Sequence, residues 1–377
     1  MTGPDAAGTD ALVDAVCRAA AALPGDVRHV VTSTIDRLAP LLDAAARERT
    51  IVRAVARLAG LDALDEHLRD PAVDEVMVNR GREVWVDRDG VLSHVADLAP
   101  GTADTVLERA LAPLGRRLDR THPIVDARLP DGSRLCAVVA PVAVDGTTVA
   151  IRRHRHRSAP LSAFAAPDVV ELLHRLVTCR CNLLVGGATS AGKTTLLDAL
   201  AACADPRDRF VVLEDTTELH LVGRHAVRLE ALHPIADTVT PVHLADLVRA
   251  ALRLRPDRLI VGEFRGVEVL AVVQALNTGH DGSLSTCHAN SAVDALRRVE
   301  TLVMQAAPSW PLTAIRRQAS RSLDVVVHVA RAADGSRRVA EVAEVVESGD
   351  EPTVRLLATG DRVLAAPQRL RRETVPA

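Results

Sequence analysis

Hydrophobic and polar positions change their spacing along the chain, and each spacing predicts a different kind of element. Through residues 10–60, Ala, Leu and Val recur every three or four positions among Arg and Asp, which predicts helices that end near Gly60. From about 61 to 155 short apolar runs alternate with polar residues, as at 74–79 and 83–87, which predicts strands joined by turns. We therefore expect a helical extension followed by a small α+β domain.

The same small domain holds one further helix and three further strands. The helix is expected near 103–114, and the strands at 125–129, 134–139 and 147–152. Two turn signals separate neighbouring strands, Asp89-Gly90 in the first half and Pro130-Asp131-Gly132 in the second.

From about residue 165 the chain alternates helix and strand, and the strands are near-continuous apolar runs. Such runs are typical of a parallel sheet that is covered on both faces. The expected strands are 182–186, 210–214, 226–230, 258–262 and 283–287, and the expected helices are 167–178, 193–203, 243–253, 267–277 and 291–305. The predicted fold class is α/β, with the division 1–60 (helical extension), 61–152 (small α+β domain), 153–164 (basic linker) and 165–377 (mostly parallel sheet with C-terminal strands and tail).

Composition adds one sharp observation, because the chain has a single lysine among 46 Lys and Arg residues. Lys193 lies in a segment that fits G-x-x-x-x-G-K-[ST], between a predicted strand and a predicted helix. Backbone N–H groups of such a loop cradle phosphates, and a compact ammonium fits between phosphate oxygens where a guanidinium would not. We therefore expect ATP to bind here, with Lys193 on the β- and γ-phosphates and the Thr194 hydroxyl on Mg²⁺. The predicted nucleotide-binding residues are Gly187, Ala188, Thr189, Ser190, Ala191, Gly192, Lys193, Thr194 and Thr195.

A second apolar strand ends in Glu263, where a P-loop enzyme places its Walker B carboxylate. The usual aspartate position is Gly262, so Glu263 is the remaining acid. We expect Glu263 to polarise the attacking water or to hold Mg²⁺ through water. The alternative is an acid that only caps the turn.

Two more groups of side chains are candidates for the same chemistry. Glu214 and Glu218 follow another core strand, at the sheet edge where ligands bind, and are expected to organise Mg²⁺ and water unless they form only a solvated acidic turn. His280 and His288 flank the strand 283–287 in a glycine-rich setting. They are candidates for sensing the γ-phosphate, although a lone histidine is more often structural.

An arginine from a neighbouring domain or subunit would neutralise charge that develops on the phosphoryl group. The candidates are Arg128 and Arg134 in the small domain, Arg153 in the basic segment 152–160, and Arg265 beside Glu263. The simpler interpretation of the basic segment is a solvated connection, and most of the other arginines are surface charge.

These motifs together resemble the secretion ATPase superfamily of type II secretion, type IV pilus and type IV secretion systems. The segments GGATSAGKTT, VVLEDTTEL, LRPDRLIVGEFRG and NTGHDGSLSTCHAN resemble its Walker A, Asp box, Walker B and His box. The segments VDEVMVNRGREVWVDRDGVL and VDARLPDGSRLCAVVAPVAVDGTTVAIRR resemble the N-terminal domain of Tad (tight adherence, Flp-type) pilus assembly ATPases. The resemblance covers about residues 60–345.

The resemblance implies a RecA-like C-terminal domain, an N-terminal domain that closes over the nucleotide, and a ring of six subunits. It implies ATP hydrolysis that drives pilus assembly or protein export, with inner-membrane platform proteins as partners. A Walker B motif without its aspartate is typical of the family. The tetracysteine of type II secretion ATPases is absent, which argues against that branch. A conjugation-type traffic ATPase shares the same chemistry and stays open as the alternative.

Bulk properties argue against two different classes of protein and bear on location. The net charge of −3 and the aromatic content of 1% argue against a nucleic-acid motor. An inactive nucleotide-binding scaffold is disfavoured because Lys193, Thr194 and Glu263 are all present. Scattered cysteines favour a reduced, cytosolic protein. The N-terminus does not resemble a signal peptide, and no apolar run reaches the roughly 18 residues that span a bilayer, so we expect the inner face of the cytoplasmic membrane to be reached through partners.

Overall fold

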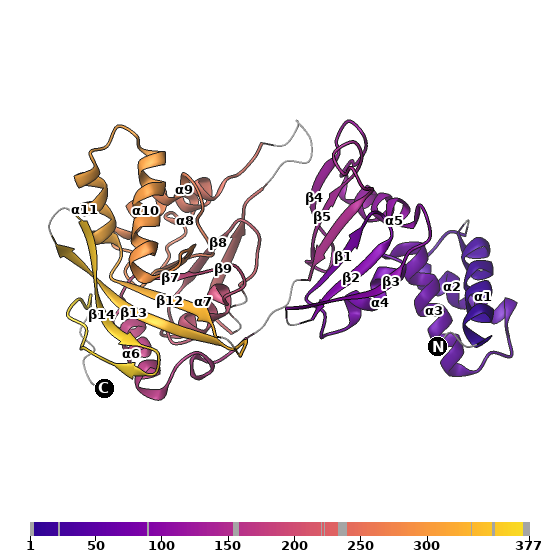
Figure 1. The fold of residues 1–377 in the computed structure, drawn as a ribbon, viewed down its shortest axis with the longest axis horizontal. Helices are drawn as coiled ribbons and strands as arrows, with labels where there is room; N and C mark the ends of the chain where they lie inside the picture. Colours follow the sequence, from indigo (N-terminus) through magenta and orange to yellow (C-terminus); the bar gives the residue numbers. More distant parts are fainter. Residues whose placement is uncertain are drawn as a thin grey trace. The chain divides into compact units, whose positions relative to one another are not determined.

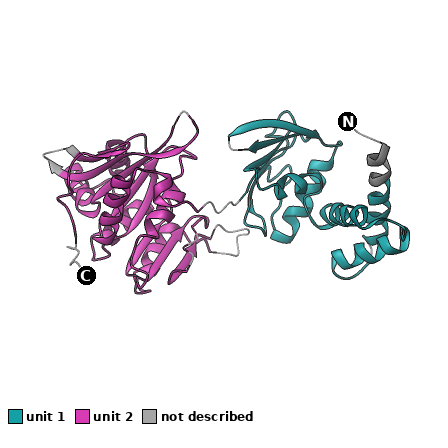
Figure 2. Ribbon diagram, turned by 90° about the horizontal axis from the view of Figure 1, so that it is seen from below, with its two compact units in different colours: residues 1–155 teal, residues 156–377 magenta. Residues whose placement is uncertain are grey.

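The computed structural model describes residues 4–371 except for 22, 89, 154–157, 220, 222, 233–239, 333 and 349–350. It divides into two compact units, residues 1–155 and 156–377 (Figure 2). Asp89 of the predicted hairpin and residues 154–157 of the predicted basic linker lie outside the described part. The division of the chain into four segments stays a prediction.

The first unit begins with three helices that pack on one another. These are α1 (Pro4–Ala20), α2 (Val27–Leu38) and α3 (Ala44–Ala59). Their apolar stripes meet in a core that contains Val16, Val31 and Ile51. Asp26 and Asp43 start α2 and α3 by accepting backbone N–H bonds at 2.9 and 2.8 Å, as N-caps do.

A six-stranded antiparallel sheet follows, in the order β3-β2-β1-β6-β5-β4. Its strands are β1 (Glu75–Asn79), β2 (Glu83–Arg88), β3 (Val91–Asp97), β4 (Ile124–Arg128), β5 (Arg134–Val138) and β6 (Thr148–Arg152). Side chains alternate between buried and exposed along β4, β5 and β6, as expected when one face of a sheet is covered. The core of this sheet includes residues of α4 (Ala63–Arg69) and α5 (Thr102–Leu111), which precedes a short helical turn, η1 (Ala112–Leu114).

The second unit is built on a nine-stranded sheet in the order β15-β14-β13-β12-β7-β11-β10-β8-β9. Neighbours from β12 to β9 are parallel, and β12 to β15 are joined antiparallel. The strands are β7 (Leu183–Gly187), β8 (Phe210–Glu214), β9 (Ala226–Glu230), β10 (Arg258–Val261), β11 (Leu284–His288), β12 (Val325–Arg331), β13 (Arg337–Ser348), β14 (Glu351–Thr359) and β15 (Arg362–Val363). The helices are η2 (Leu161–Ala163), α6 (Pro167–Thr178), α7 (Lys193–Ala201), α8 (Leu244–Ala251), α9 (Glu268–Leu276), α10 (Ala292–Ala306) and α11 (Leu312–Ser322).

Helices cover both faces of this sheet (Figure 1). The core on one face joins residues of α6 and α7 to Leu183 and Val185 of β7, and the core on the other joins α8 to α11 to Leu184. Alternate residues of one strand thus enter opposite cores, which explains the continuous apolar run in the sequence. The predicted α/β fold class is confirmed. The antiparallel extension β13 to β15 is the part whose pairing the apolar pattern did not define.

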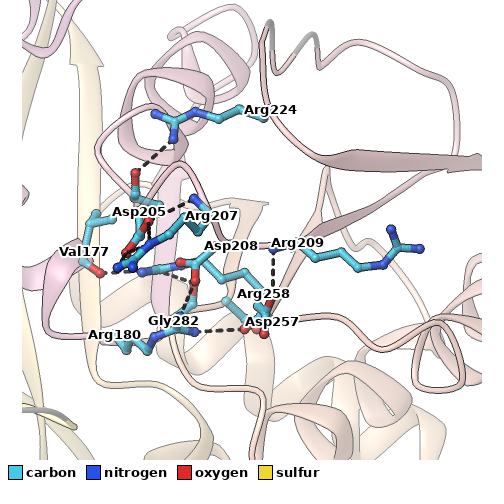
Figure 3. Close-up of polar contacts among 12 residues, drawn as sticks. Val177, Arg180, Asp205, Arg207, Asp208, Arg209, Arg224, Asp257, Arg258 and Gly282 are labelled. Carbon is cyan, nitrogen blue, oxygen red and sulfur yellow. Dashed lines mark hydrogen bonds and ion pairs between the residues drawn. The ribbon is translucent and has the colours of Figure 1, made fainter.

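A buried ion cluster ties together the amino ends of the parallel strands (Figure 3). Arg258, 1% exposed at the start of β10, bonds Asp208 through Nε at 2.6 Å. Its Nη1 donates to the carbonyl oxygens of Val177 and Gly282, both at 3.1 Å, and Arg180 also pairs with Asp208. One guanidinium therefore fastens the end of α6 and the turn before β11 to the start of β10.

Helix length also bears on membrane contact. The longest helices are α1 with 17 residues and α3 with 16, and both carry charged side chains. Within the described ranges, no helix combines the length and the apolar character needed to cross a membrane.

Candidate functional site

The predicted phosphate loop lies at the carboxyl edge of the parallel sheet, between Gly187 at the end of β7 and Lys193 at the start of α7. Ala188 to Gly192 form the turn, and Thr194 and Thr195 continue into the first turn of the helix. Gly192 has φ +97°, and a Cβ on Gly187 would lie 2.6 Å from the carbonyl oxygen of Val329. Glycine is required at both positions, one for its backbone angle and one for close packing.

Lys193 is folded into this loop and is 7% exposed. Its Nζ donates to the carbonyl oxygens of Gly187 at 3.2 Å and Ala188 at 3.0 Å, and lies 3.3 Å from Nδ1 of His288. Burial lowers the pKa of the Lys193 ammonium, and the carboxylate of Glu263 opposes that shift. The loop thus holds a cation at the point where phosphates would bind.

Glu263 and His288 lie beside that cation. Nε2 of His288 is 2.9 Å from Oε1 of Glu263, and Arg265 binds the same carboxylate through Nε at 2.9 Å and Nη2 at 3.1 Å. Burial alone would raise the pKa of Glu263, but the bonds and charge of Arg265, together with Lys193, bring it below its usual value. Burial lowers the pKa of His288. A neutral ring that accepts at Nδ1 and donates from Nε2 satisfies both of its neighbours.

The acidic turn after β8 approaches the loop from another strand. Oε2 of Glu218 accepts a hydrogen bond from Oγ1 of Thr194 at 3.2 Å. Oε1 of Glu214 accepts the backbone N–H groups of Glu218 and Leu219 at 2.9 and 3.0 Å. Glu214 therefore shapes the turn, and Glu218 is the acid of the turn that contacts the loop.

Glu214 is buried to an unusual degree for a carboxylate. It is 3% exposed, and its Oε2 has no hydrogen-bond partner. Burial raises the pKa of Glu214 to about 7, against the two backbone bonds that favour the ionised form.

The structure also explains the missing aspartate of the Walker B motif. A Cβ on Gly262 would lie 2.8 Å from Cγ of Glu214, well inside the range of ordinary contacts. The side chain of Glu214, from the adjacent strand β8, fills the space that a side chain at 262 would need. The buried side chain of Glu214 therefore favours glycine at position 262.

His280 is not brought to the loop within this unit. His288 pairs with Gly187 in the register of β11 and β7, whereas His280 precedes the other end of β11. Nδ1 of His280 lies 3.2 Å from the carbonyl oxygen of Ala275, and its own carbonyl accepts from Ser283 Oγ at 2.6 Å. These contacts describe a turn at the opposite edge of the sheet.

The four candidate arginines have different surroundings. Arg128 and Arg134 face each other across the β4–β5 hairpin of the first unit. The guanidinium of Arg153 donates to the backbone carbonyls of Asp70 and Val73, so it is engaged within the first unit. Arg265 holds the carboxylate of Glu263.

Residues that the sequence did not single out also lie near the loop. An open cleft of about 500 Å³ is lined by Ala188, Thr189, His288, Ala289, Asn290, Asp294 and Arg298. On another side, a Cβ on Gly192 would lie 2.7 Å from Cδ of Arg337. In an arginine-rich chain, no local pattern distinguishes Arg298 or Arg337 from the surface arginines.

Oxygen atoms suited to binding Mg²⁺ lie at the loop, although the described side chains do not by themselves form a complete metal site. In the described part of the chain, no three His, Cys, Asp or Glu side chains come together as a metal site. Mg²⁺ characteristically keeps several waters and binds one or two protein oxygens plus phosphates, so no cage is required. The hydroxyl of Thr194 and the carboxylate of Glu218, 3.2 Å apart, fit that donor set. Glu263 is engaged by Arg265 and His288 instead.

A glycine-rich loop between a parallel strand and a helix, with a buried lysine and an opposing carboxylate, defines a P-loop nucleoside triphosphatase. The family model described as Type II/IV secretion system protein matches residues 58–360. The chain belongs to this family, and the predicted enzyme class, a secretion ATPase, is confirmed at that level.

Sequence relatives cover most of the chain. A protein of Mycobacterium tuberculosis named for conjugal transfer is 37% identical over 299 residues, which are 76% of this chain and 84% of the relative. The conjugal transfer protein TrbB of Rhizobium radiobacter is 34% identical, over 75% of this chain and 87% of its own length. The type IV secretion system protein PtlH of Bordetella pertussis is 33% identical, over 74% and 91%.

Solved structures agree on the fold. The Legionella pneumophila ATPase DotB superposes with a TM-score of 0.53 at 19% identity and covers 73% of this chain and 77% of its own. The pilus retraction motor PilT, solved with ADP, superposes with a TM-score of 0.52 at 19% identity, over 79% and 82%. These likenesses support the fold class alone.

Proposed function

We propose that this chain is the ATP-hydrolysing motor of a conjugation-type, type IV secretion system. The observation that carries the proposal is the chain of contacts from Lys193 through His288 to Glu263 at the phosphate loop. The names of the relatives support the branch, since they concern conjugal transfer and type IV secretion. The Tad pilus branch, expected from the sequence, has less support from them.

In the proposed mechanism the phosphates of ATP bind the N–H groups of the loop and the N-terminus of α7. The ammonium of Lys193, now satisfied by the carbonyls of Gly187 and Ala188, turns to the β- and γ-phosphate oxygens. Thr194 and Glu218 would supply the oxygens that hold Mg²⁺. The metal would screen the phosphate charge.

Glu263 then orients the attacking water and accepts its proton, while the water oxygen bonds to the γ-phosphorus and the bond from that phosphorus to the departing ADP oxygen breaks. Arg265 keeps the carboxylate ionised, which a base requires. His288 lies between the base and Lys193, so its position couples the base to occupancy of the loop. An arginine from the first unit or from a second copy, Arg128 or Arg134, would complete charge neutralisation, as arginine fingers do.

We further propose a ring of six subunits that docks on inner-membrane proteins of the secretion system, at the cytoplasmic face. Family membership supports both statements. His280, at the far edge of the sheet, would then act at a contact between subunits and not in its own subunit's site.

The decisive experiment is Mg²⁺-dependent ATP turnover by the purified chain and two variants. Lys193→Ala should lose ATP binding and turnover, because the only lysine of the loop is gone. Glu263→Gln should bind ATP normally and lose turnover by about 100-fold or more, because an amide cannot accept the proton of water. Titration calorimetry with ATP separates the two effects.

Glu268→Gln is the matched control for Glu263→Gln. Glu268 Oε1 accepts N–H bonds from Arg265 and Gly266, a contact that a glutamine oxygen can also make. The Glu268→Gln variant should hydrolyse ATP at the wild-type rate. If Glu263→Gln hydrolyses ATP as fast as this control does, the proposed base is wrong.

The genes beside this one distinguish the two branches. Relaxase and coupling-protein genes would support the conjugation-type assignment, whereas prepilin and membrane-platform genes would favour the Tad pilus.

A further inference from the structure

The phosphate loop has two unlike neighbours in the sheet. Strand β7, which feeds the loop, lies between β11 and β12. The β11 side carries His288, which contacts Glu263 and lies beside Lys193. The β12 side carries the β12–β13 hairpin, whose Val329 carbonyl would be 2.6 Å from a Cβ on Gly187. The hairpin thus forms a wall of the loop opposite the groups proposed for hydrolysis.

The side chain of Arg337 extends from this wall to Gly192. A Cβ on Gly192 would lie 2.7 Å from its Cδ, 3.5 Å from its Cγ and 3.4 Å from its Nε. Gly192 is the N-cap residue of α7, so the aliphatic stem of Arg337 lies at the beginning of the helix proposed to receive phosphates. Arg337 also pairs in register with Arg331.

The orientation of a bound nucleotide follows from the two sides of the loop. Its terminal phosphate must face Glu263, which lies on the β11 side with His288. The nucleoside therefore extends away from Glu263, toward the β12–β13 wall. In that direction η2 and β13 meet, since the N–H of Val339 donates to the carbonyl of Phe164 at 2.9 Å.

No Phe or Trp ring in the described part of the second unit is available to stack on a base there. Phe164 and Phe264 are 3% exposed and Phe210 is fully buried within the cores. Trp310 packs against the core of the opposite face, with α8 to α11. A planar guanidinium is another group that stacks on a ring.

We propose that Arg337 is a specificity-determining residue that holds the nucleoside half of ATP, with its guanidinium stacked on the base and its stem over Gly192. This proposal rests on the proposed ATPase function of the same site. It assigns to the β13 arginine the base contact that aromatic residues make in many nucleotide sites. The ligand class is a purine nucleoside triphosphate, because the larger ring offers more area for stacking.

The test compares ATP with a ligand that has the same chain of three phosphates but no nucleoside. Binding of ATP and of inorganic tripolyphosphate, both with Mg²⁺, is measured by titration calorimetry on the full chain and on Arg337→Ala. We expect the affinity for ATP to fall about tenfold, the size of a desolvated guanidinium–ring contact, and the affinity for tripolyphosphate to stay unchanged. Arg337→Lys, which keeps the charge without the plane, should behave like Arg337→Ala.

Arg338→Ala is the matched control. Arg338 is the next residue, is exposed, and pairs with Asp334 at 3.4 Å, so both affinities should stay at the wild-type values. An equal loss of ATP and tripolyphosphate binding in Arg337→Ala would make Arg337 a phosphate contact and overturn the proposal. Unchanged ATP binding in Arg337→Ala, or full rescue by Arg337→Lys, would overturn it too. A wild-type chain that binds no ATP would instead overturn the proposed function itself.

Discussion

At the scale of single residues, Glu214 and Gly262 depend on each other. The side chain of Glu214 occupies the space that a side chain at position 262 would need. Its carboxylate is buried there with one oxygen that has no hydrogen-bond partner, which has an electrostatic cost. That cost makes Glu214 a pH-sensitive residue.

The pKa of Glu214 near 7 leads to a stability prediction. The pKa of Glu214 is higher in the folded state than its unfolded value near 4.5. Between these two pKa values the folded state therefore binds more protons than the unfolded state, and stability falls as pH rises. The contribution of Glu214 should fall by about 3 kcal/mol between pH 4.5 and 7. Glu214→Gln removes the ionisation, so its free energy of unfolding should rise relative to that of the wild type as pH increases over that range. Urea unfolding at several pH values measures it.

The free energy of unfolding is compared between the wild type and Glu214→Gln at each pH. The other titrating groups are the same in both proteins, so their contributions cancel. Glu218→Gln serves as control, because it removes a carboxylate from the same turn without touching the buried one. A constant stability difference between wild type and Glu214→Gln across the interval between the two pKa values would contradict the raised pKa.

At the scale of elements, the two edges of the parallel sheet have different roles: one is stabilised by buried ion pairs and the other carries the candidate site. The amino ends are tied by Arg258 and Asp208 among backbone carbonyls (Figure 3), while the carboxyl ends carry the phosphate loop and Glu263. Because structure and chemistry lie at opposite edges, mutations can separate them.

Arg258→Met should destabilise the fold without harming the site. It removes the printed donor to the carbonyl of Gly282, one of the donors to the carbonyl of Val177 and one of the partners of Asp208, at a cost of about 3 kcal/mol in the free energy of unfolding. ATP turnover per folded molecule should stay at the wild-type rate below the melting range. Denaturant unfolding and turnover on the same sample measure both.

The control is Arg207→Met, whose partner Asp205 lies in the same region but at the surface. Their exposed side chains should make no measurable difference to stability. A loss of stability in Arg207→Met as large as in Arg258→Met would mean that burial is not the cause.

At the scale of the whole molecule, the proposed finger arginine and the phosphate loop belong to different units. Arg265, the arginine beside the proposed base, is engaged with Glu263. Arg128 and Arg134 belong to the first unit, and the proposed ring would allow them to act on a site in another copy. Sharing of sites between subunits makes a prediction about mixtures.

Lys193→Ala and Arg134→Ala should each lose turnover alone and recover part of it when mixed. A Lys193→Ala subunit still offers its arginine to the intact loop of an Arg134→Ala neighbour. Random assembly in a head-to-tail ring predicts about a quarter of the wild-type rate. ATPase assays on subunits mixed under dissociating conditions and then reassembled measure it. Arg120→Ala in place of Arg134→Ala is the control, because that exposed arginine lies outside the β4–β5 hairpin.

If Arg134→Ala is inactive alone and mixing restores nothing, Arg134 acts in the site of its own subunit. If Arg134→Ala alone keeps the wild-type rate, Arg134 is not the finger. The same mixing with Arg128→Ala then tests Arg128.

The sequence by itself determined the α/β alternation, the phosphate loop, and Glu263 as the acid after β10. These are local features: apolar runs show a strand covered on both faces, and the glycine and lysine spacing shows the loop. Lys193 was the most informative residue because no other lysine competes with it.

Which of the remaining candidate residues come together depends on long-range packing. His280 and His288 look equivalent in sequence, but a strand separates them and brings only His288 to the loop. Glu214 and Gly262 lie 48 positions apart, and their close approach depends on the parallel pairing of β8 and β10. Arg337 reaches Gly192 through a hairpin whose register depends on contacts across the sheet. Such contacts join residues distant in the chain, so no local pattern encodes them.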